Sequence, residues 1–157
     1  MGKGFRYQPN WSPDSKKIAF VDEMVNIHVH NLETGLTSRI DQAQWQNHFG
    51  LQNFSLNWSP DSRYLTYTKT INGRADAVFI HDGQTGVVTQ VTSGYYNDNN
   101  PVFDVDGKYL YFMSDRALRP VYSDLDWAFV YPNSTQIVAV TLTKDGKSPL
   151  YPRNDEV

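Results

Sequence analysis

Trp11-Ser-Pro-Asp-Ser-Lys-Lys-Ile-Ala-Phe20 decides the fold, because this stretch occurs more than once. It returns as Trp58-Ser-Pro-Asp-Ser-Arg-Tyr-Leu-Thr-Tyr67, and a looser third copy runs Phe103-Asp-Val-Asp-Gly-Lys-Tyr-Leu-Tyr-Phe112. The aspartates that the copies share, Asp14, Asp61 and Asp106, lie 47 residues (61 − 14) and 45 residues (106 − 61) apart. Repeats of about 40 to 50 residues are typical of β-propeller blades and of helical arrays.

Alternating β-branched and aromatic residues decide between these two architectures. One such run follows the turn of each copy, at 18–22, 65–68 and 110–113. A second run comes later in each unit, at 27–30, 77–80 and 137–140. Period-two alternation of this composition indicates half-buried strands, and no stretch keeps a helical period. In the first two units a further run follows a Thr-Gly pair, whose glycine suits a tight hairpin.

These patterns predict an all-β fold, a partial β-propeller of about three four-stranded antiparallel sheets. We expect one domain over 1–157, with blades at about 5–42, 54–94 and 99–151. The third unit contains an insert at 114–135, and loops of that length are uncommon unless they have a function.

The repeated turn has its own mechanics. Pro13 and Pro60 hold φ near −65° at the first central position, and the following aspartates accept from neighbouring amides. The third copy keeps the turn with Gly107 instead. The aromatic residue before each turn is expected to lie as a wedge between neighbouring sheets. The predicted structural residues are Trp11, Pro13, Asp14, Trp58, Pro60, Asp61, Phe103, Asp106 and Gly107.

Composition excludes several classes of protein. The 157 residues carry 14 Lys+Arg against 17 Asp+Glu, a net charge of −3, and no basic run, which argues against a nucleic-acid partner. The longest apolar stretches are too short for a transmembrane helix, so no membrane partner is expected. Without cysteine there is no disulfide, thiolate zinc site or cysteine nucleophile. The compartment is not assigned; an N-terminus unlike a signal peptide favours cytoplasm over periplasm for the segment as given.

A search for reactive chemistry finds no nucleophile elbow, zinc-protease helix, phosphate loop or dinucleotide fingerprint. We therefore predict no catalytic residue, no cofactor and no metal. His28 and His30 share one face of a strand and have the spacing of a chelating pair, but the sequence offers no third ligand. Because catalytic triads are assembled by tertiary structure, an enzyme without a sequence motif stays an alternative.

Aromatic and polar residues gather at two places, the segment before the third copy and the insert. Rings with interspersed amides and carboxylates suit contact with an extended oligopeptide or a protein partner. The alternative is that these rings pack the insert against its own blade. The candidate contact residues are Tyr95, Tyr96, Asn97, Asp98, Tyr122, Asp124, Asp126 and Trp127.

The Trp-Ser-Pro-Asp-Ser repeat resembles the WD-like repeat of TolB-type propellers and of tricorn-type serine peptidases. Five stretches resemble the C-terminal part of the second, seven-bladed tricorn-type propeller: 53–62, 91–101, 109–116, 120–126 and 148–157. The resemblance covers essentially the whole chain. It implies a large oligomeric peptidase in which a propeller filters or channels oligopeptides toward a separate catalytic domain. No position here matches the catalytic motifs of that family. The resemblance therefore implies a non-catalytic segment; the alternative function is a stand-alone TolB-like scaffold for protein–protein interaction.

Ring closure is the last constraint. Propellers have typically four to eight blades, so about three repeats cannot close a ring. The outer faces of the terminal blades would then be apolar and uncovered. We expect either a homo-oligomer that completes the ring, for example two three-bladed halves, or the rest of a larger polypeptide.

Overall fold

A computed structural model of the chain describes residues 4–43, 50–71, 75–117, 121–122, 129–130 and 134–149. Apart from a short 3₁₀ turn, η1 (Gly50–Asn53), the regular structure of these residues is β. The first sheet has the order β1-β2-β3-β4 and the second β5-β6-β7-β8, and both are antiparallel throughout. Their strands are β1 (Arg6–Trp11), β2 (Lys17–Asp22), β3 (Asn26–Asn31), β4 (Thr37–Gln42), β5 (Leu56–Trp58), β6 (Tyr64–Ile71), β7 (Ala75–Asp82) and β8 (Val88–Gln90).

The third sheet has the order β9-β10-β13, so it shows three strands in the described residues where four were expected. A separate two-stranded hairpin lies between β10 and β13 in the chain, within the predicted insert. The elements are β9 (Asp98–Phe103), β10 (Tyr109–Ser114), β11 (Val121–Tyr122), β12 (Phe129–Val130) and β13 (Gln136–Thr141). In the part of the chain that is described, no helix is long and apolar enough to cross a bilayer.

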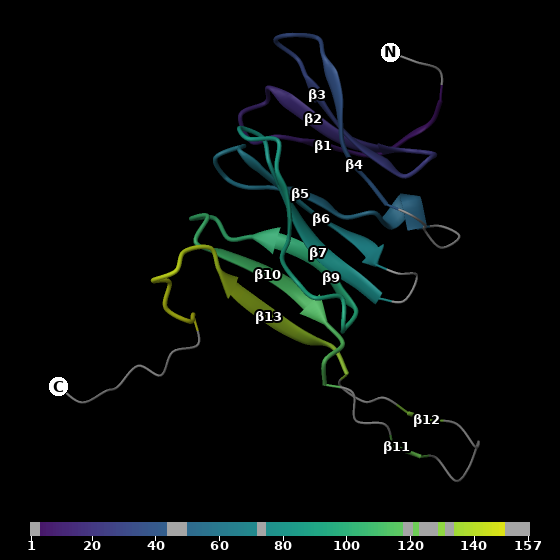
Figure 1. Cartoon of the computed structure of the whole chain (residues 1–157), viewed down its shortest axis with the longest axis vertical. Helices are drawn as coiled ribbons and strands as arrows, with labels where there is room; N and C mark the ends of the chain where they lie inside the picture. Colours follow the sequence, from purple (N-terminus) through teal and green to yellow (C-terminus); the bar gives the residue numbers. More distant parts are fainter. Residues whose placement is uncertain are drawn as a thin grey trace, which may run out of the picture.

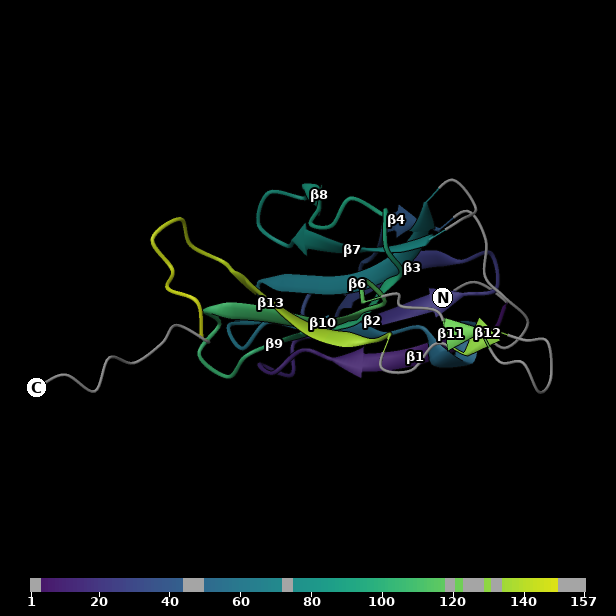
Figure 2. The same ribbon diagram turned by 90° about the horizontal axis from the view of Figure 1, so that it is seen from below.

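The three sheets are stacked face to face in chain order (Figure 1). The first strands β1 and β9 lie at one edge of the stack and the last strands β4 and β8 at the opposite edge (Figure 2). Neighbouring first strands contact each other, β1 with β5 and β5 with β9. This is the arrangement of successive propeller blades, and it confirms the predicted fold class.

We call the contact between the first two sheets the first seam and that between the second and third sheets the second seam. Each seam is an apolar layer, as expected where sheets bury their alternating residues. The residues buried in the first seam include Ala19, Val21, Ile27, Trp58, Leu65, Tyr67 and Phe79. Those of the second seam include Val78, Phe103, Leu110 and Phe112.

Polar groups also bridge the first seam. Asn10 Nδ2 donates to the Leu56 carbonyl over 3.0 Å, and Trp58 Nε1 donates to the Asn10 carbonyl over 3.2 Å. At the other edge, Asp41 accepts from the Tyr67 hydroxyl at 2.7 Å. Burial and this hydrogen bond raise the pKa of Tyr67 well above its usual value.

The repeated turn behaves as its residues predict. Ser15 (φ 60°), Ser62 (φ 61°) and Gly107 (φ 67°) occupy the same left-handed position in the three copies. Asp14 Oδ1 accepts from the Lys16 amide over 3.0 Å. The third turn differs, because Asp104 stands where the others have serine. Its Oδ1 accepts from two amides, those of Lys108 at 2.6 Å and Tyr109 at 2.8 Å. In the first two turns, the equivalent amides donate to two different side chains, the aspartate and the serine of the turn.

The aromatic residues before the turns differ in exposure. Trp58 and Phe103 are buried in the seams, with 6% and 8% of their surface exposed, whereas Trp11 is 57% exposed. Each wedge faces the preceding sheet, and no sheet precedes the first one among the described residues. Trp11 therefore departs from the expected position between two sheets.

Candidate functional site

The loop between β8 and β9 meets the base of the insert at one end of the third sheet. The Asp115 amide donates to the Asn97 carbonyl, and the Ala117 amide donates to the Ser134 carbonyl, both over 3.2 Å. The structure thus brings Tyr95, Tyr96, Asn97 and Asp98 beside the two chain segments that lead into and out of the insert. We call this group of loops the loop cluster.

Asp98 is the buried anion of the loop cluster. Only 2% of its side chain is exposed, and Arg116 Nη2 lies 3.5 Å from its Oδ1. Arg116 Nε also donates to the Ser114 hydroxyl over 2.8 Å. Because a buried carboxylate needs a compensating partner, the pairing with Arg116 compensates for the burial of Asp98.

A second hydrogen-bond network ties the loop cluster to its own sheet and to the preceding one. Asp115 accepts from Asn97 Nδ2 at 3.2 Å and from the Thr135 hydroxyl at 2.7 Å. Asn97 Oδ1 in turn accepts from the Asp76 amide in β7 over 3.3 Å. The loop is therefore held by side-chain contacts on both sides.

Two tyrosines, Tyr95 and Tyr96, lie at the surface of the loop cluster. Tyr95 is 81% exposed and packs edge-to-face on Tyr96, with 5.0 Å between the ring centroids and 81° between the planes. The Arg116 guanidinium lies over the Tyr96 ring, 5.3 Å from its centroid, a cation–π contact that orients the pair. An exposed ring held in place can contact a ligand at low entropic cost.

A polar hollow of about 530 Å³ runs beside the first strands of the sheets. Gln8, Ser55 and Asn100 line it, and each lies three residues before the aromatic wedge of its own repeat. Gln8 and Asn100 have positive φ values of 52° and 51°. Each sits at an irregularity in strand register, which turns the local backbone. In a propeller the first strands face the central channel, so these three side chains are candidate channel residues.

Several predicted contact residues cannot be placed. Asp124, Asp126 and Trp127 lie outside the described residues, and of Tyr122 only the backbone in β11 is described. Asp115, Arg116 and Thr135 also belong to the loop cluster, although they were not among the predicted contact residues. One feature of the sequence could have indicated them. The oppositely charged pair Asp115-Arg116 directly follows a strand of the third repeat, and a strand that simply ends at the surface does not require such a pair.

The two histidines that have the spacing of a chelating pair, His28 and His30, are engaged in structural contacts. His28 Nε2 lies 2.8 Å from Asp22 Oδ2, and His30 Nδ1 lies 2.9 Å from the Thr37 hydroxyl. Burial acts to raise the pKa of Asp22, but hydrogen bonds from Asn26 and His28 outweigh it and lower that pKa to about 2. Within the described residues, no three His, Asp or Glu side chains form a group able to hold a metal ion.

Comparison with known proteins gives the family. Residues 1–157 match the tricorn protease second β-propeller domain. A tricorn-like protease C-terminal subunit of Sulfurisphaera tokodaii is 30% identical over 109 residues, which is 69% of this chain and 12% of that protein. The crystal structure of the tricorn protease superimposes with a TM-score of 0.82 at 20% identity, covering 95% of this chain and 15% of that one.

A second structural likeness concerns the propeller fold more widely. TolB from Acinetobacter baumannii superimposes with a TM-score of 0.56 at 25% identity, covering 82% of this chain and 32% of that one. The chain thus spans a small part of each of these relatives, and its repeats have the blade architecture that they share. Since the family match extends from end to end, the chain belongs to the family of the tricorn protease second β-propeller domain.

Proposed function

We propose that the chain is a non-catalytic part of a propeller that admits oligopeptides and guides them toward a separate peptidase domain. The observation that carries this proposal is the exposed Tyr95–Tyr96 pair, fixed by Arg116 at the end of the blades. A mobile pair of rings would lose entropy on binding, whereas this one is already ordered. Tyr122, Asp124, Asp126 and Trp127 of the insert are proposed to complete the contact surface.

The polar hollow supports the same proposal. Gln8, Ser55 and Asn100 are uncharged, and their amide and hydroxyl groups can donate to and accept from a peptide backbone whatever its sequence. Such a lining suits passage of many peptides better than tight binding of one.

The outer faces of the stack support membership in a larger ring. Ile137 in β13 is 78% exposed, although the equivalent Ile27 and Val78 are completely buried against the following sheet. Trp11 is exposed on the opposite outer face. We propose that further blades cover both faces, supplied by the rest of a larger polypeptide or by a second copy of this chain. Sedimentation of the chain separates the two: a stable 18.0 kDa monomer contradicts self-association.

Peptide binding tests the proposal. Fluorescein-labelled octapeptides of differing sequence should bind the chain, as measured by anisotropy, and Tyr95→Ala should weaken binding about tenfold, as for an interface anchor. Val105→Ala is the matched control, because Val105 is equally exposed but lies in the turn at the opposite end of β9. Absence of binding, or equal effects of both substitutions, contradicts the proposal.

The alternative functions give different results. A TolB-like scaffold would bind a folded protein partner and none of the octapeptides. An enzyme would hydrolyse fluorogenic oligopeptides in a reaction that a serine-directed inhibitor stops, whereas we expect no turnover.

A further inference from the structure

A lysine side chain fills the first seam beside the repeated turns. Lys17 of the first sheet reaches the second sheet, where its Nζ donates to the Ser62 carbonyl over 3.0 Å. The same ammonium lies 5.7 Å from the centroid of the Trp58 ring. The Asp14 amide adds a bond to the Ser62 hydroxyl over 3.0 Å. This part of the first seam is therefore closed by a cation with an aliphatic stem.

The second seam has the same repeat positions beside its turns but different side chains. The amides of Gly83 and Leu142 donate to equivalent carbonyls, those of Arg63 and Lys108, so the two turns have equivalent positions in their own sheets. At equivalent repeat positions, the second seam has Tyr64 where the first has Lys17. It likewise has Phe103 in place of Trp58 and Gly107 in place of Ser62. The second seam thus lacks the lysine, has a smaller wedge and has lost the hydroxyl that accepted from the facing turn.

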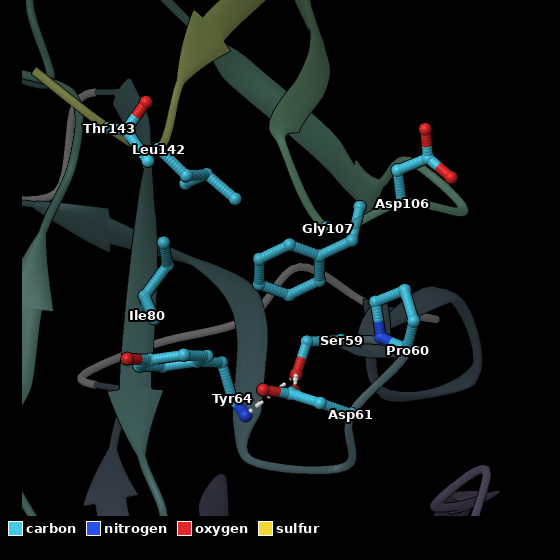
Figure 3. A pocket seen from close by; sticks show the side chains of 10 residues that line it. Ser59, Pro60, Asp61, Tyr64, Ile80, Asp106, Gly107, Leu142 and Thr143 are labelled. Atoms are coloured by element: carbon cyan, nitrogen blue, oxygen red, sulfur yellow. Dashed lines mark hydrogen bonds between the residues drawn. The ribbon is translucent and has the colours of Figure 1, made fainter. Parts of the chain in front are cut away.

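These replacements leave a cavity of about 380 Å³. Its walls are largely apolar and include Pro60, Tyr64, Ile80, Phe103 and Leu142. In Figure 3, Tyr64, Ile80 and Leu142 form one side of the cavity, and Pro60 lies across from them. Such walls accept an alkyl or aromatic group, and the volume falls in the range of small-molecule sites.

Both signs of charge occur around this cavity: the Asp61 carboxylate lines it, and the Arg63 guanidinium lies 4.7 Å from the centroid of the Tyr64 ring, which also lines it. Asp61 accepts from the Ser59 hydroxyl and the Arg63 amide, and within the described ranges no basic side chain forms an ion pair with it. The hydrogen bond from Ser59 lowers the pKa of Asp61, so it is ionised at neutral pH.

The nearby cations are already paired. Arg63 forms an ion pair with Asp82, and Lys108 with Asp106. The Asp106 carboxylate points away from the cavity (Figure 3). Asp61 is thus the carboxylate left to attract a cation.

We propose that the second seam binds a lysine side chain presented by a polypeptide partner. The aliphatic stem would lie along Phe103 and Ile80, as long basic side chains do on apolar surfaces, with the ammonium at Asp61 and the Gly107 carbonyl. The first seam shows that the blade scaffold accommodates this chemistry, because Lys17 places its own ammonium on the equivalent carbonyl. The site lies at the opposite end of β9 from the loop cluster, so it is independent of the function proposed above.

The test compares two small probes on the folded chain. Nα-acetyl-lysine N-methylamide and its neutral norleucine analogue differ at the end of the side chain, where only lysine carries an ammonium. In ¹H–¹⁵N correlation spectra with up to about 50 mM probe, a range suited to a fragment, the lysine probe should shift the amides of Gly107, Leu142 and Thr143. We expect lysine to bind about fivefold more tightly than norleucine, the gain of one partly exposed ion pair. Absence of these shifts, or equal affinity for the two probes, overturns the proposal.

Two variants locate the site. Asp61→Asn keeps an acceptor for the turn and should reduce lysine binding to the norleucine level. Asp14→Asn is the matched control at the same turn position of the first sheet, and it should leave binding unchanged. Tyr64→Lys should supply the ammonium from within the chain and abolish binding, with the remaining resonances showing that the fold is intact. An unaltered affinity in Asp61→Asn, or an undiminished one in Tyr64→Lys, contradicts the assignment.

Discussion

The two tryptophans at the same repeat position should respond very differently to the same substitution. Trp58→Phe and Trp11→Phe each remove an indole in favour of the ring that the third repeat carries naturally. Trp58 is buried in the first seam and bonds to the Asn10 carbonyl, whereas Trp11 is more than half exposed on an outer face.

The magnitude follows from these contacts. Trp58→Phe loses one hydrogen bond, which contributes about 1 kcal/mol. The smaller ring leaves part of the seam unfilled, which costs about 1 kcal/mol more. The free energy of unfolding should therefore fall by about 2 kcal/mol. Trp11→Phe changes an exposed position and should stay within about 0.5 kcal/mol of the parent chain.

Equilibrium urea unfolding measures both changes. Far-UV circular dichroism is the suitable signal, because the substitutions alter tryptophan fluorescence directly. With a typical urea dependence, the midpoint of Trp58→Phe should fall by about 1 M and that of Trp11→Phe should hardly move. Equal losses in the two variants would refute the interpretation of the aromatic residue as a wedge against the preceding blade.

Three further predictions concern turns, pH and the loop cluster. Asp104→Ala should lower the free energy of unfolding by about 1–2 kcal/mol in urea titrations, because two amides lose their acceptor, and Asp104→Ser should recover most of the loss. The folded pKa of Asp22 is about 2, below its ordinary value of 3.8, so its contribution to stability is complete above the unfolded pKa and disappears as the pH falls through the folded one. Acid titration followed by circular dichroism should accordingly show a smaller loss of stability below about pH 4 in Asp22→Asn than in the parent. Arg116→Met should cost about 2 kcal/mol in thermal or urea unfolding by leaving Asp98 buried without a cation, and adding Asp98→Asn should restore part of it; a double variant no more stable than Arg116→Met would contradict this pairing.

The sequence predicts the repeating part of this fold well because the residues within each repeat determine its own strands and turns. Alternation identifies the strands, and the positive φ of Gly35 and Gly86 after the Thr-Gly pairs was predictable from residue type alone. The third turn was predicted to survive the loss of proline. The sequence does not predict the role of Asp104 in this turn, because a carboxylate at the serine position could equally be a residue that only contacts solvent.

Features that depend on tertiary position could not be predicted in the same way. Trp11 and Trp58 have the same neighbours in sequence, so their different burial follows only from which sheet lies beside each. Likewise, Arg116 and Asp98 lie on different segments, and nothing in either segment identifies the other as its partner. The predicted loop Tyr95–Asp98 was found at the base of the insert, yet the arginine that orders it appeared only in three dimensions.

Solvent exposure of Trp11 tests most directly the claim that this chain is one section of a larger ring. With 5-fluorotryptophan incorporated, the ¹⁹F solvent isotope shift between H₂O and D₂O reports the contact of each indole with water, and Trp58 provides an internal standard. In the isolated chain Trp11 should show a large shift and Trp58 a small one. In the full-length polypeptide or the completed oligomer, the shift of Trp11 should fall to that of Trp58; a Trp11 that stays as exposed there as in the isolated chain would contradict the account.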